Sequence, residues 1–248
     1  MKSRYLLLSS LALLIFVTTL GNAAGPAPDT PSSGSSITGT VKLDGPAPPP
    51  MHLQMIGDPV CAKAHPSPVM SSEVETGAGG ALENVVVYVS DGLPADQTFT
   101  PPAQPANLEQ KGCLYNPHVV AVQSGQTLRV VNDDQTTHNI HLMPINNREW
   151  NKSQPPGVII EETIPRQEIA IPVKCNIHPW MKSYVAVFKH PFFAVTGKDG
   201  SFDLKNLPPG TYTIQAWHEK LGTSSQKITV GTNETKSLQF VFKSRPGM

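Results

Sequence analysis

The stretch EIAIPVKCNIHPWMKSYVAVF, residues 168–188, shows most clearly how this chain folds. It begins with an apolar segment, residues 168–173, and it ends with residues 184–188, which read Tyr-Val-Ala-Val-Phe. Both segments are short and rich in β-branched or aromatic residues, which is typical of β-strands. We therefore expect one strand, a short loop and a second strand.

Short strands of this kind recur along most of the chain. Turn signals separate them, among them Lys198-Asp-Gly, Pro208-Pro-Gly and Glu219-Lys-Leu-Gly. Many short strands with turns every 8–12 residues or so indicate an all-β sandwich, or two of them. The 25 prolines argue against long helices, and no amphipathic helix is evident in the sequence. The expected strands are residues 37–43, 84–89, 119–122, 127–132, 139–142, 158–163, 168–173, 184–188, 192–196, 201–204, 211–217, 226–230 and 237–242.

The composition of the 248-residue chain excludes two broad classes of function. Lysine and arginine total 19, aspartate and glutamate also total 19, and the formal net charge is therefore zero. A protein that binds nucleic acid through its phosphates is normally basic, so nucleic acid is not an expected partner. The interior contains no apolar run of about 20 residues, which excludes a polytopic membrane protein.

The N-terminus has the organisation of a secretory signal peptide. Lys2 and Arg4 precede an apolar stretch, residues 6–20, and small residues follow as far as Ala24. We expect a signal peptide over residues 1–24, with an uncleaved anchor helix as the alternative. After cleavage no membrane span would remain, and the protein would be periplasmic or secreted. Residues 25–36, rich in Pro, Ser and Gly, are expected to form a flexible leader.

The loop inside residues 168–188 contains three potential metal ligands. Cys175, His178 and Met181 follow one another at intervals of three residues, and His138 lies upstream, after the end of another expected strand. A thiolate, two imidazoles and a weak thioether form the donor set of a blue-copper site. Zinc rarely accepts methionine and would favour a carboxylate or a water molecule instead. The pattern therefore predicts a copper site built from these four residues.

His141 is a further histidine in the same region. It lies three residues after His138, so the alternation of side chains along a strand would place it on the opposite face. We expect a structural or supporting role for His141, with copper ligation as the alternative.

Part of the chain, residues 112–190, resembles a small cupredoxin of the amicyanin and plastocyanin group. The resemblance implies a Greek-key β-sandwich over residues 101–190 that holds one type 1 copper ion. The chain departs from the family in an insertion, residues 144–156, after the first ligand strand. The matching motifs are the strand pair 115–132, the segment Asn132-Asp-x4-His138-Asn139 and the loop Cys175-x2-His178-Pro179-x-Met181. Carried over by position, the copper ligands would be His138, Cys175, His178 and Met181.

The resemblance also implies roles for residues beside the ligands. Asn139 would link the two ligand loops by hydrogen bonding. His178 would present its imidazole edge near the surface, ringed by Pro179 and Trp180, where members of the family bind their redox partners. The inserted residues 144–156 could cover or reshape that surface.

A second resemblance concerns the C-terminal part of the chain. Residues 191–248 resemble a carboxypeptidase regulatory-like, or transthyretin-like, β-sandwich. The family's earlier strands match residues 39–46 and 84–89, which precede the cupredoxin-like part. We expect a discontinuous sandwich over residues 37–100 and 191–248 with the cupredoxin inserted, and a simple tandem of domains is the alternative. The matching text is Thr196-Gly-Lys-Asp-Gly-Ser-Phe202-Asp-Leu and Leu207-Pro-Pro-Gly-Thr-Tyr212-Thr-Ile.

Two cysteines remain if Cys175 binds copper. In an oxidising compartment Cys61 and Cys113 are expected to form a disulfide, which would join two proline-rich segments. Alternatively, they belong to a second metal site together with His65 and His118.

Together these features predict an exported copper protein that passes single electrons to a redox partner protein. One alternative is a protein that holds Cu(I) with the same donors and hands it on, for which the Met and His residues within 51–70 would be suited. Another is a structural module that does not use copper. We do not expect an enzyme, because the chain lacks the His-x-His pair of a multicopper cluster, a zinc-hydrolase motif and a G-x-S-x-G motif.

Overall fold

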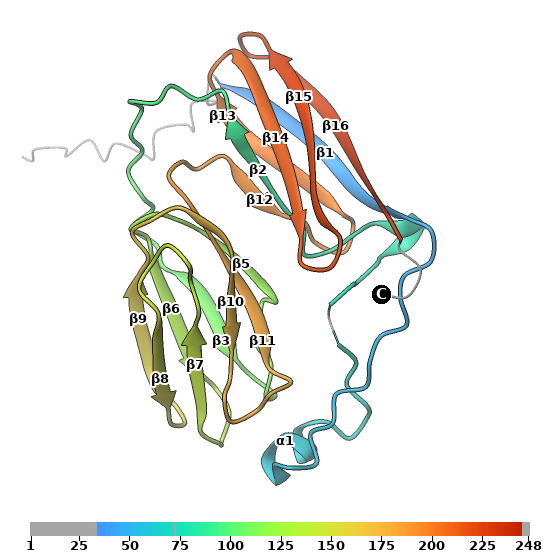
Figure 1. Cartoon of the computed structure of the whole chain (residues 1–248), viewed down its shortest axis with the longest axis vertical. Helices are drawn as coiled ribbons and strands as arrows, with labels where there is room; N and C mark the ends of the chain where they lie inside the picture. The colour runs from blue at the N-terminus through green and yellow to red at the C-terminus, as the bar shows by residue number, and fades with distance from the viewer. Residues whose placement is uncertain (1–33, 72, 245–248) are drawn as a thin grey trace, which may run out of the picture. The chain divides into compact units, whose positions relative to one another are not determined.

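The computed structural model describes residues 34–71 and 73–244, and within these ranges the chain consists mainly of β-strands (Figure 1). Its helical structure there is limited to the six-residue helix α1 (Pro59–Ala64) and the 3-10 helix η1 (Ala78–Gly80). The all-β prediction is confirmed, although the sequence pattern does not predict α1. No helix of the described part is long and apolar enough to span a membrane. The predicted signal peptide lies outside the described residues.

Strand β1 (Ser35–Asp44) begins earlier than the sequence pattern indicates. Ser35 pairs with Leu207, and Ser36 pairs with Thr235. The prediction of a flexible leader over residues 25–36 is therefore wrong for its last two residues, because neighbouring strands on both sides hold them.

Two sheets formed by strands from both ends of the described chain make up one sandwich, which we call the terminal sandwich. Their strand orders are β13-β1-β16 and β12-β2-β14-β15. β1 lies between β13, to which it is antiparallel, and β16, to which it is parallel. Apolar side chains of both sheets share one core, as the alternation in β13 and β14 predicts. The remaining bounds are β2 (Val86–Asp91), β12 (Phe193–Val195), β13 (Ser201–Leu207), β14 (Gly210–His218), β15 (Gly222–Val230) and β16 (Thr235–Lys243).

The strands that lie between β2 and β12 in the chain form a second sandwich, the central sandwich. Its sheets have the orders β5-β11-β10-β7-β8 and β4-β3-β6-β9. Leu108, Ile140 and Val185 are among the buried residues of its core. The central sandwich is thus inserted between β2 and β12 of the terminal sandwich. Its strands are β3 (Ala106–Gln110), β4 (Tyr115–Asn116), β5 (Val119–Gln123), β6 (Thr127–Asn132), β7 (His138–Leu142), β8 (Trp150–Gln154), β9 (Ile159–Thr163), β10 (Glu168–Lys174) and β11 (Lys182–Phe188).

Two strands of the central sandwich have sequences that do not indicate strands. β3 reads Ala-Asn-Leu-Glu-Gln, and only Leu108 and Gln110 of it are buried. β8 reads Trp-Asn-Lys-Ser-Gln and lies at the edge of its sheet, where it pairs with β7. Both lack the regular apolar alternation by which strands are recognised. The expected insertion, residues 144–156, therefore contains an edge strand of the sheet to which β7 and β10 belong.

The segment between β1 and β2 carries α1 and packs against the central sandwich. Asp58 caps the helix, because its Oδ1 accepts the backbone N–H groups of Val60 at 2.7 Å and Cys61 at 3.2 Å. Pro59 follows as the first helical residue, a position that suits proline. Met55 and Cys61 are buried in the core of the central sandwich. These contacts hold a helix that would be too short to persist by itself.

Candidate metal centre

The predicted ligands lie at one end of two neighbouring strands of one sheet. β7 begins at His138, and its antiparallel neighbour β10 ends at Lys174, one residue before Cys175. His178 and Met181 follow in the loop that leads to β11. Antiparallel pairing brings the start of one strand beside the end of the other, so the fold brings these two segments together.

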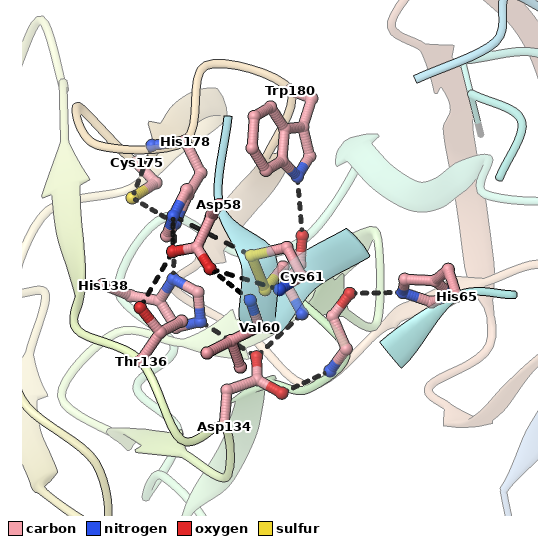
Figure 2. Close-up of a disulfide and its surroundings, with 12 residues drawn as sticks. Asp58, Val60, Cys61, His65, Asp134, Thr136, His138, Cys175, His178 and Trp180 are labelled. Atoms are coloured by element: carbon pink, nitrogen blue, oxygen red, sulfur yellow. Dashed lines mark hydrogen bonds and ion pairs between the residues drawn. A yellow bond between two sulfur atoms is a disulfide. The ribbon is translucent and has the colours of Figure 1, made fainter. Parts of the chain in front are cut away.

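Three of the four predicted ligands converge on one point (Figure 2). One ligand atom from each of His138, Cys175 and His178 lies within 4.8 Å of the other two. The Nδ1 atoms of the two histidines are 2.8 Å apart, and the Sγ of Cys175 is 3.9 Å from the Nδ1 of His178. At most 2% of each residue is exposed. The chain therefore contains a buried set of one sulfur and two nitrogen donors.

Met181, the fourth predicted ligand, is completely buried in the core that also contains Cys175. Its backbone N–H donates to the carbonyl of His178 at 2.9 Å. The backbone N–H of Cys175 in turn donates to the carbonyl of Met181 at 3.2 Å. These two bonds hold the loop in a compact turn, so that all three of its candidate ligands stay close to one another.

Cys175 is a free cysteine whose surroundings favour the thiolate. Its Sγ accepts the backbone N–H groups of Asn139 at 3.4 Å and His178 at 3.3 Å. Burial raises the pKa of the thiol, but the hydrogen bond from His138 and these backbone donors outweigh burial, so the pKa lies below its ordinary value. A lowered pKa increases the share of thiolate, which is the form that binds metals.

A carboxylate holds the outer nitrogen of each histidine. The Nε2 of His138 lies 2.9 Å from the Oδ2 of Asp134, and the Nε2 of His178 lies 3.0 Å from the Oδ2 of Asp58. An imidazole that donates its Nε2–H to a carboxylate keeps the lone pair of Nδ1 for a metal. The Nδ1 side of each ring thus faces the cluster with Cys175, and the proton shared between the two Nδ1 atoms would leave when a metal binds.

The same contacts shift the pKa values of the paired groups. Burial lowers the pKa of His138, but Asp134 and Cys175 more than offset burial and raise the pKa to about 9. Burial raises the pKa of Asp58, whereas the hydrogen bond from His178 and the other donors lower it to about 2. Asp58 is therefore ionised at neutral pH.

Neither Asp58 nor Asp134 stands out in the sequence as part of the site. The pair Asp58-Pro59 does mark the start of a helix, because Asp followed by Pro is frequent there, but it does not mark a residue of the metal site. Asp134 belongs to the quoted segment 132–139, but its spacing does not distinguish it from its exposed neighbour Asp133. The structure shows that both carboxylates belong to the site.

Asn139 links the two ligand segments. Its Oδ1 accepts the backbone N–H of Asn176, the residue after Cys175, and its Nδ2 donates to the Oδ1 of Asn151 on β8. Its own backbone N–H donates to the Sγ of Cys175. Asn139 thereby connects β7, the ligand loop and β8, which agrees with the bracing expected from the cupredoxin resemblance.

The expectation that His178 presents its imidazole edge near the surface is wrong. Only 2% of His178 is exposed, because Asp58 bonds to its Nε2 and the Sγ of Cys61 lies 3.8 Å from the same nitrogen. Pro179 is exposed and Trp180 is half-buried, with its ring centre 5.0 Å from that of His178. The docking role of Pro179 and Trp180 stays a prediction.

Cys61 and Cys113 form a disulfide beside the ligand cluster (Figure 2). The alternative, a second metal site shared with His65 and His118, is not the arrangement found. The Nε2 of His65 bonds to a backbone carbonyl, and His118 pairs with Glu219. The disulfide instead ties α1 to the loop before β4 and keeps Cys61 next to the site.

His141 is not among the converging donors of the described residues. Its Nε2 pairs with Glu149 at 2.7 Å, and its Nδ1 lies 3.2 Å from the Oδ1 of Asn176. Both ring nitrogens are therefore engaged with polar side chains rather than with Cys175, which favours a supporting role over ligation.

The donor set fits copper better than zinc. Copper in both oxidation states accepts a thiolate and two imidazoles, with a thioether as a weak further contact. Zinc would favour a fourth strong donor such as a carboxylate. Here the two nearby carboxylates bond to the outer Nε2 atoms, whereas the buried thioether of Met181 belongs to the ligand loop. Copper would thus be held by His138, Cys175 and His178, with Met181 as the candidate for a weak fourth ligand.

Comparison with known proteins gives slight structural likenesses. No family model and no curated protein sequence matches the chain. A Cu-containing nitrite reductase from Thermus scotoductus SA-01 is 18% identical over 41% of this chain, with a TM-score of 0.33, and the match spans 26% of the reductase. A purple cupredoxin from Nitrosopumilus maritimus is 22% identical over 33% of this chain and 98% of its own, with a TM-score of 0.29. A Cu(I) form of an amicyanin variant is 16% identical over 41% of this chain and 97% of its own, with a TM-score of 0.31.

Proposed function

We propose that this chain is a copper protein that carries single electrons. The observation that carries the proposal is the convergence of His138 Nδ1, Cys175 Sγ and His178 Nδ1 in a buried cluster, within the same core as Met181. This is the donor set of a type 1 copper centre. Bound copper would supply a Cu(II)/Cu(I) couple that takes up or releases one electron.

The supports around the donors favour electron transfer over chemistry on a substrate. Asn139 links the two ligand segments, backbone N–H groups hold the Sγ of Cys175, and carboxylates hold both outer histidine nitrogens. Side chains locked in this way keep their positions when the charge of the metal changes. The ligands are also almost fully buried, which leaves them poorly accessible to a substrate. We therefore propose a carrier rather than an enzyme.

The proposed docking area for a redox partner protein is Pro179 with Trp180. Pro179 is exposed, and the half-buried ring of Trp180 packs against His178. Because Asp58 covers the imidazole edge of His178, the indole is the aromatic group through which a partner could approach this ligand. The proposed compartment is the periplasm or the exterior of the cell. The signal-peptide pattern of residues 1–24 and the disulfide both support export.

A second candidate function is the transfer of Cu(I) to another protein. The observation in its favour is a pair of exposed thioethers on the segment between β1 and β2, since 58% of Met51 and 44% of Met70 are accessible. Thioethers are soft ligands that select Cu(I). In this version the buried centre stores the ion, and the exposed methionines pass it on.

Titration with Cu(II) tests the leading proposal. The chain without residues 1–24 should take up one copper ion and show an intense visible absorption band from thiolate-to-copper charge transfer. The band should vanish in Cys175→Ser and persist in His141→Gln, the matched control from the same region. A colourless protein that binds only Cu(I) would favour the transfer function instead, and a chain that binds neither ion would refute both.

A further inference from the structure

The two carboxylates at the outer histidine nitrogens come from different parts of the chain. Asp134 lies in the loop before β7, four residues before its partner His138. Asp58 lies 120 residues before its partner His178, on the segment that precedes the central sandwich. A local loop thus supports one histidine, whereas a remote segment supports the other.

Asp58 is held in place from several sides (Figure 2). Its Oδ1 accepts the two backbone N–H groups at the start of α1, from Val60 and Cys61. Its Oδ2 accepts the hydroxyl of Thr136 at 3.0 Å and the Nε2–H of His178 at 3.0 Å. The disulfide of Cys61 anchors α1 to the central sandwich. The carboxylate can therefore neither rotate away nor withdraw without breaking several of these contacts.

This geometry has two physical consequences for His178. The bond from Nε2–H to the carboxylate fixes the orientation and tautomer of the ring, so that the lone pair of Nδ1 faces Cys175 and His138. The carboxylate also places a negative charge directly behind a candidate ligand. Only 18% of the Asp58 side chain is exposed, so water screens this charge less than it would at an open surface.

We propose that Asp58 is a positioning residue of the metal centre. It holds His178 with Nδ1 directed at the metal, and its charge favours Cu(II), the more highly charged state, over Cu(I). Asp58 thereby lowers the reduction potential of the centre. The inference rests on the proposed copper function and adds a role for a residue outside the ligand loops.

A purely structural role for Asp58 makes a different prediction. If Asp58 served only as the cap of α1, any good capping residue could replace it without effect on the metal centre. Asn and Ser both cap helices well. Asp58→Asn removes the charge at nearly constant size, and Asp58→Ser is too short to reach His178. Asp133→Asn is the control, because it removes one charge from an exposed carboxylate on the loop before β7.

The first readout needs no metal. Nitrogen-15 NMR of the histidine rings in the metal-free protein reports which ring nitrogen of His178 carries the proton. The wild type and Asp133→Asn should show the proton on Nε2. In Asp58→Asn and Asp58→Ser the ring should lose this single tautomer and show a mixture, because the charged acceptor at Nε2 has been removed: the single oxygen of Asn stays at the cap of α1 and turns its NH2 group toward Nε2, and Ser does not reach the ring.

The second readout is the reduction potential of the copper-loaded protein. Loss of a supporting partner of a metal-bound histidine typically costs 10- to 100-fold in metal affinity. We expect both Asp58 variants to lose about tenfold in affinity for Cu(II) relative to Cu(I), which corresponds to a potential about 59 mV higher for a one-electron couple. Asp133→Asn should shift the potential by much less.

A third variant keeps the test decisive if changes at Asp58 impair folding. Thr136→Val removes one donor from the Oδ2 of Asp58 and leaves the charge in place. The carboxylate then becomes a stronger acceptor for His178, so the potential should move in the opposite direction and fall.

The outcomes separate this inference from the proposed function. Wild-type protein that takes up no copper refutes the function, while the NMR tautomer still reports on Asp58. A copper protein whose tautomer and potential are the same in Asp58→Asn, Asp58→Ser and Asp133→Asn overturns the role of Asp58 and leaves the function intact. A Thr136→Val potential that is higher than that of the wild type also contradicts the inference.

Discussion

The Nδ1 atoms of His138 and His178 face each other at 2.8 Å, although 40 positions separate the two residues in the chain. At this distance one nitrogen donates a hydrogen bond to the other. Asp58 sets the direction of this bond, because a His178 ring that donates its Nε2–H to Asp58 has an acceptor at Nδ1, and His138 is then the donor. His178 then accepts with the same lone pair that it would offer to a metal. The metal-free chain thus holds its two imidazoles in the orientation that copper would require.

Met181→Leu should leave copper binding intact and change its redox behaviour. Leucine has nearly the same volume, so the unfolding free energy of the metal-free protein should change by less than about 1.5 kcal/mol. Cys175 and both histidines remain, and the visible band should persist. The potential should rise, because Cu(I) is satisfied by the three remaining donors, whereas Cu(II) favours a further ligand and loses more when the thioether is removed. Voltammetry checks this, with Met143→Leu as the control, and an unchanged potential would show that Met181 is not a ligand.

Asn139→Ala should loosen the link between the ligand segments. The backbone N–H of Asn176 and the side chain of Asn151 both lose a partner in this variant. Leaving such groups without a partner in a partly buried place costs about 1–3 kcal/mol each. Urea unfolding of the metal-free protein should show this loss, and copper should dissociate faster. Asn107→Ala, at an exposed position of β3, should change neither quantity.

Removal of the disulfide should destabilise the chain. Cys61 and Cys113 are 52 positions apart, and a cross-link that closes a loop of this length stabilises a protein by about 4 kcal/mol in the chain-entropy model. The double variant Cys61→Ser, Cys113→Ser should therefore unfold at clearly lower urea concentration in the metal-free state. Proteolysis should then cut first near α1, because this helix loses its covalent anchor. Equal urea midpoints for variant and wild type would contradict the prediction.

The buried His218 should make stability fall in mildly acidic solution. Burial and the positive charges of His118 and Lys220 lower the pKa of His218 from 6.5 to about 4 in the folded state. The unfolded chain therefore binds this proton more readily, so the contribution of His218 to stability is complete above pH 6.5 and declines as the pH falls toward 4. Between pH 7 and pH 5 the loss should be about 2 kcal/mol.

Variants at two histidines check this pH dependence. Urea unfolding at pH 7 and pH 5 should show a smaller difference in His218→Gln, which cannot be protonated, than in the wild type. His52→Gln, at an exposed position, should retain the full difference. A His218 variant with the wild-type pH dependence would place the cause elsewhere.

The parts of the site that sequence alone predicts are those with local signals. Cys175, His178 and Met181 lie in seven consecutive residues, and donor chemistry alone identifies them. His138 is recognisable from its place after a strand and from the resemblance to cupredoxins. Asp58 is not recognisable, because it reaches His178 only through a six-residue helix and a disulfide that join distant segments.

The strands, too, are predictable only where the sequence has a local signal. Strands with apolar runs, such as β2 and β11, are evident from the sequence, whereas β3 and the polar edge strand β8 are not. The exposure expected for His178 fails for a related reason. The resemblance to cupredoxins includes the ligand loops. It does not include the segment between β1 and β2, which carries Asp58 and buries His178 in this chain. The transthyretin-like identity of the terminal sandwich, the redox partner and the compartment remain predictions.

The position of β1 between β13 and β16 links the completion of the fold to the last strand of the described chain. During synthesis, β1 emerges before the central sandwich, and both of its neighbours emerge after it. Until residues 235–243 have been made, one edge of β1 has no partner and can pair with other chains. A truncated chain that already contains every candidate ligand would thus be prone to aggregate, which favours its removal before it takes up a metal ion.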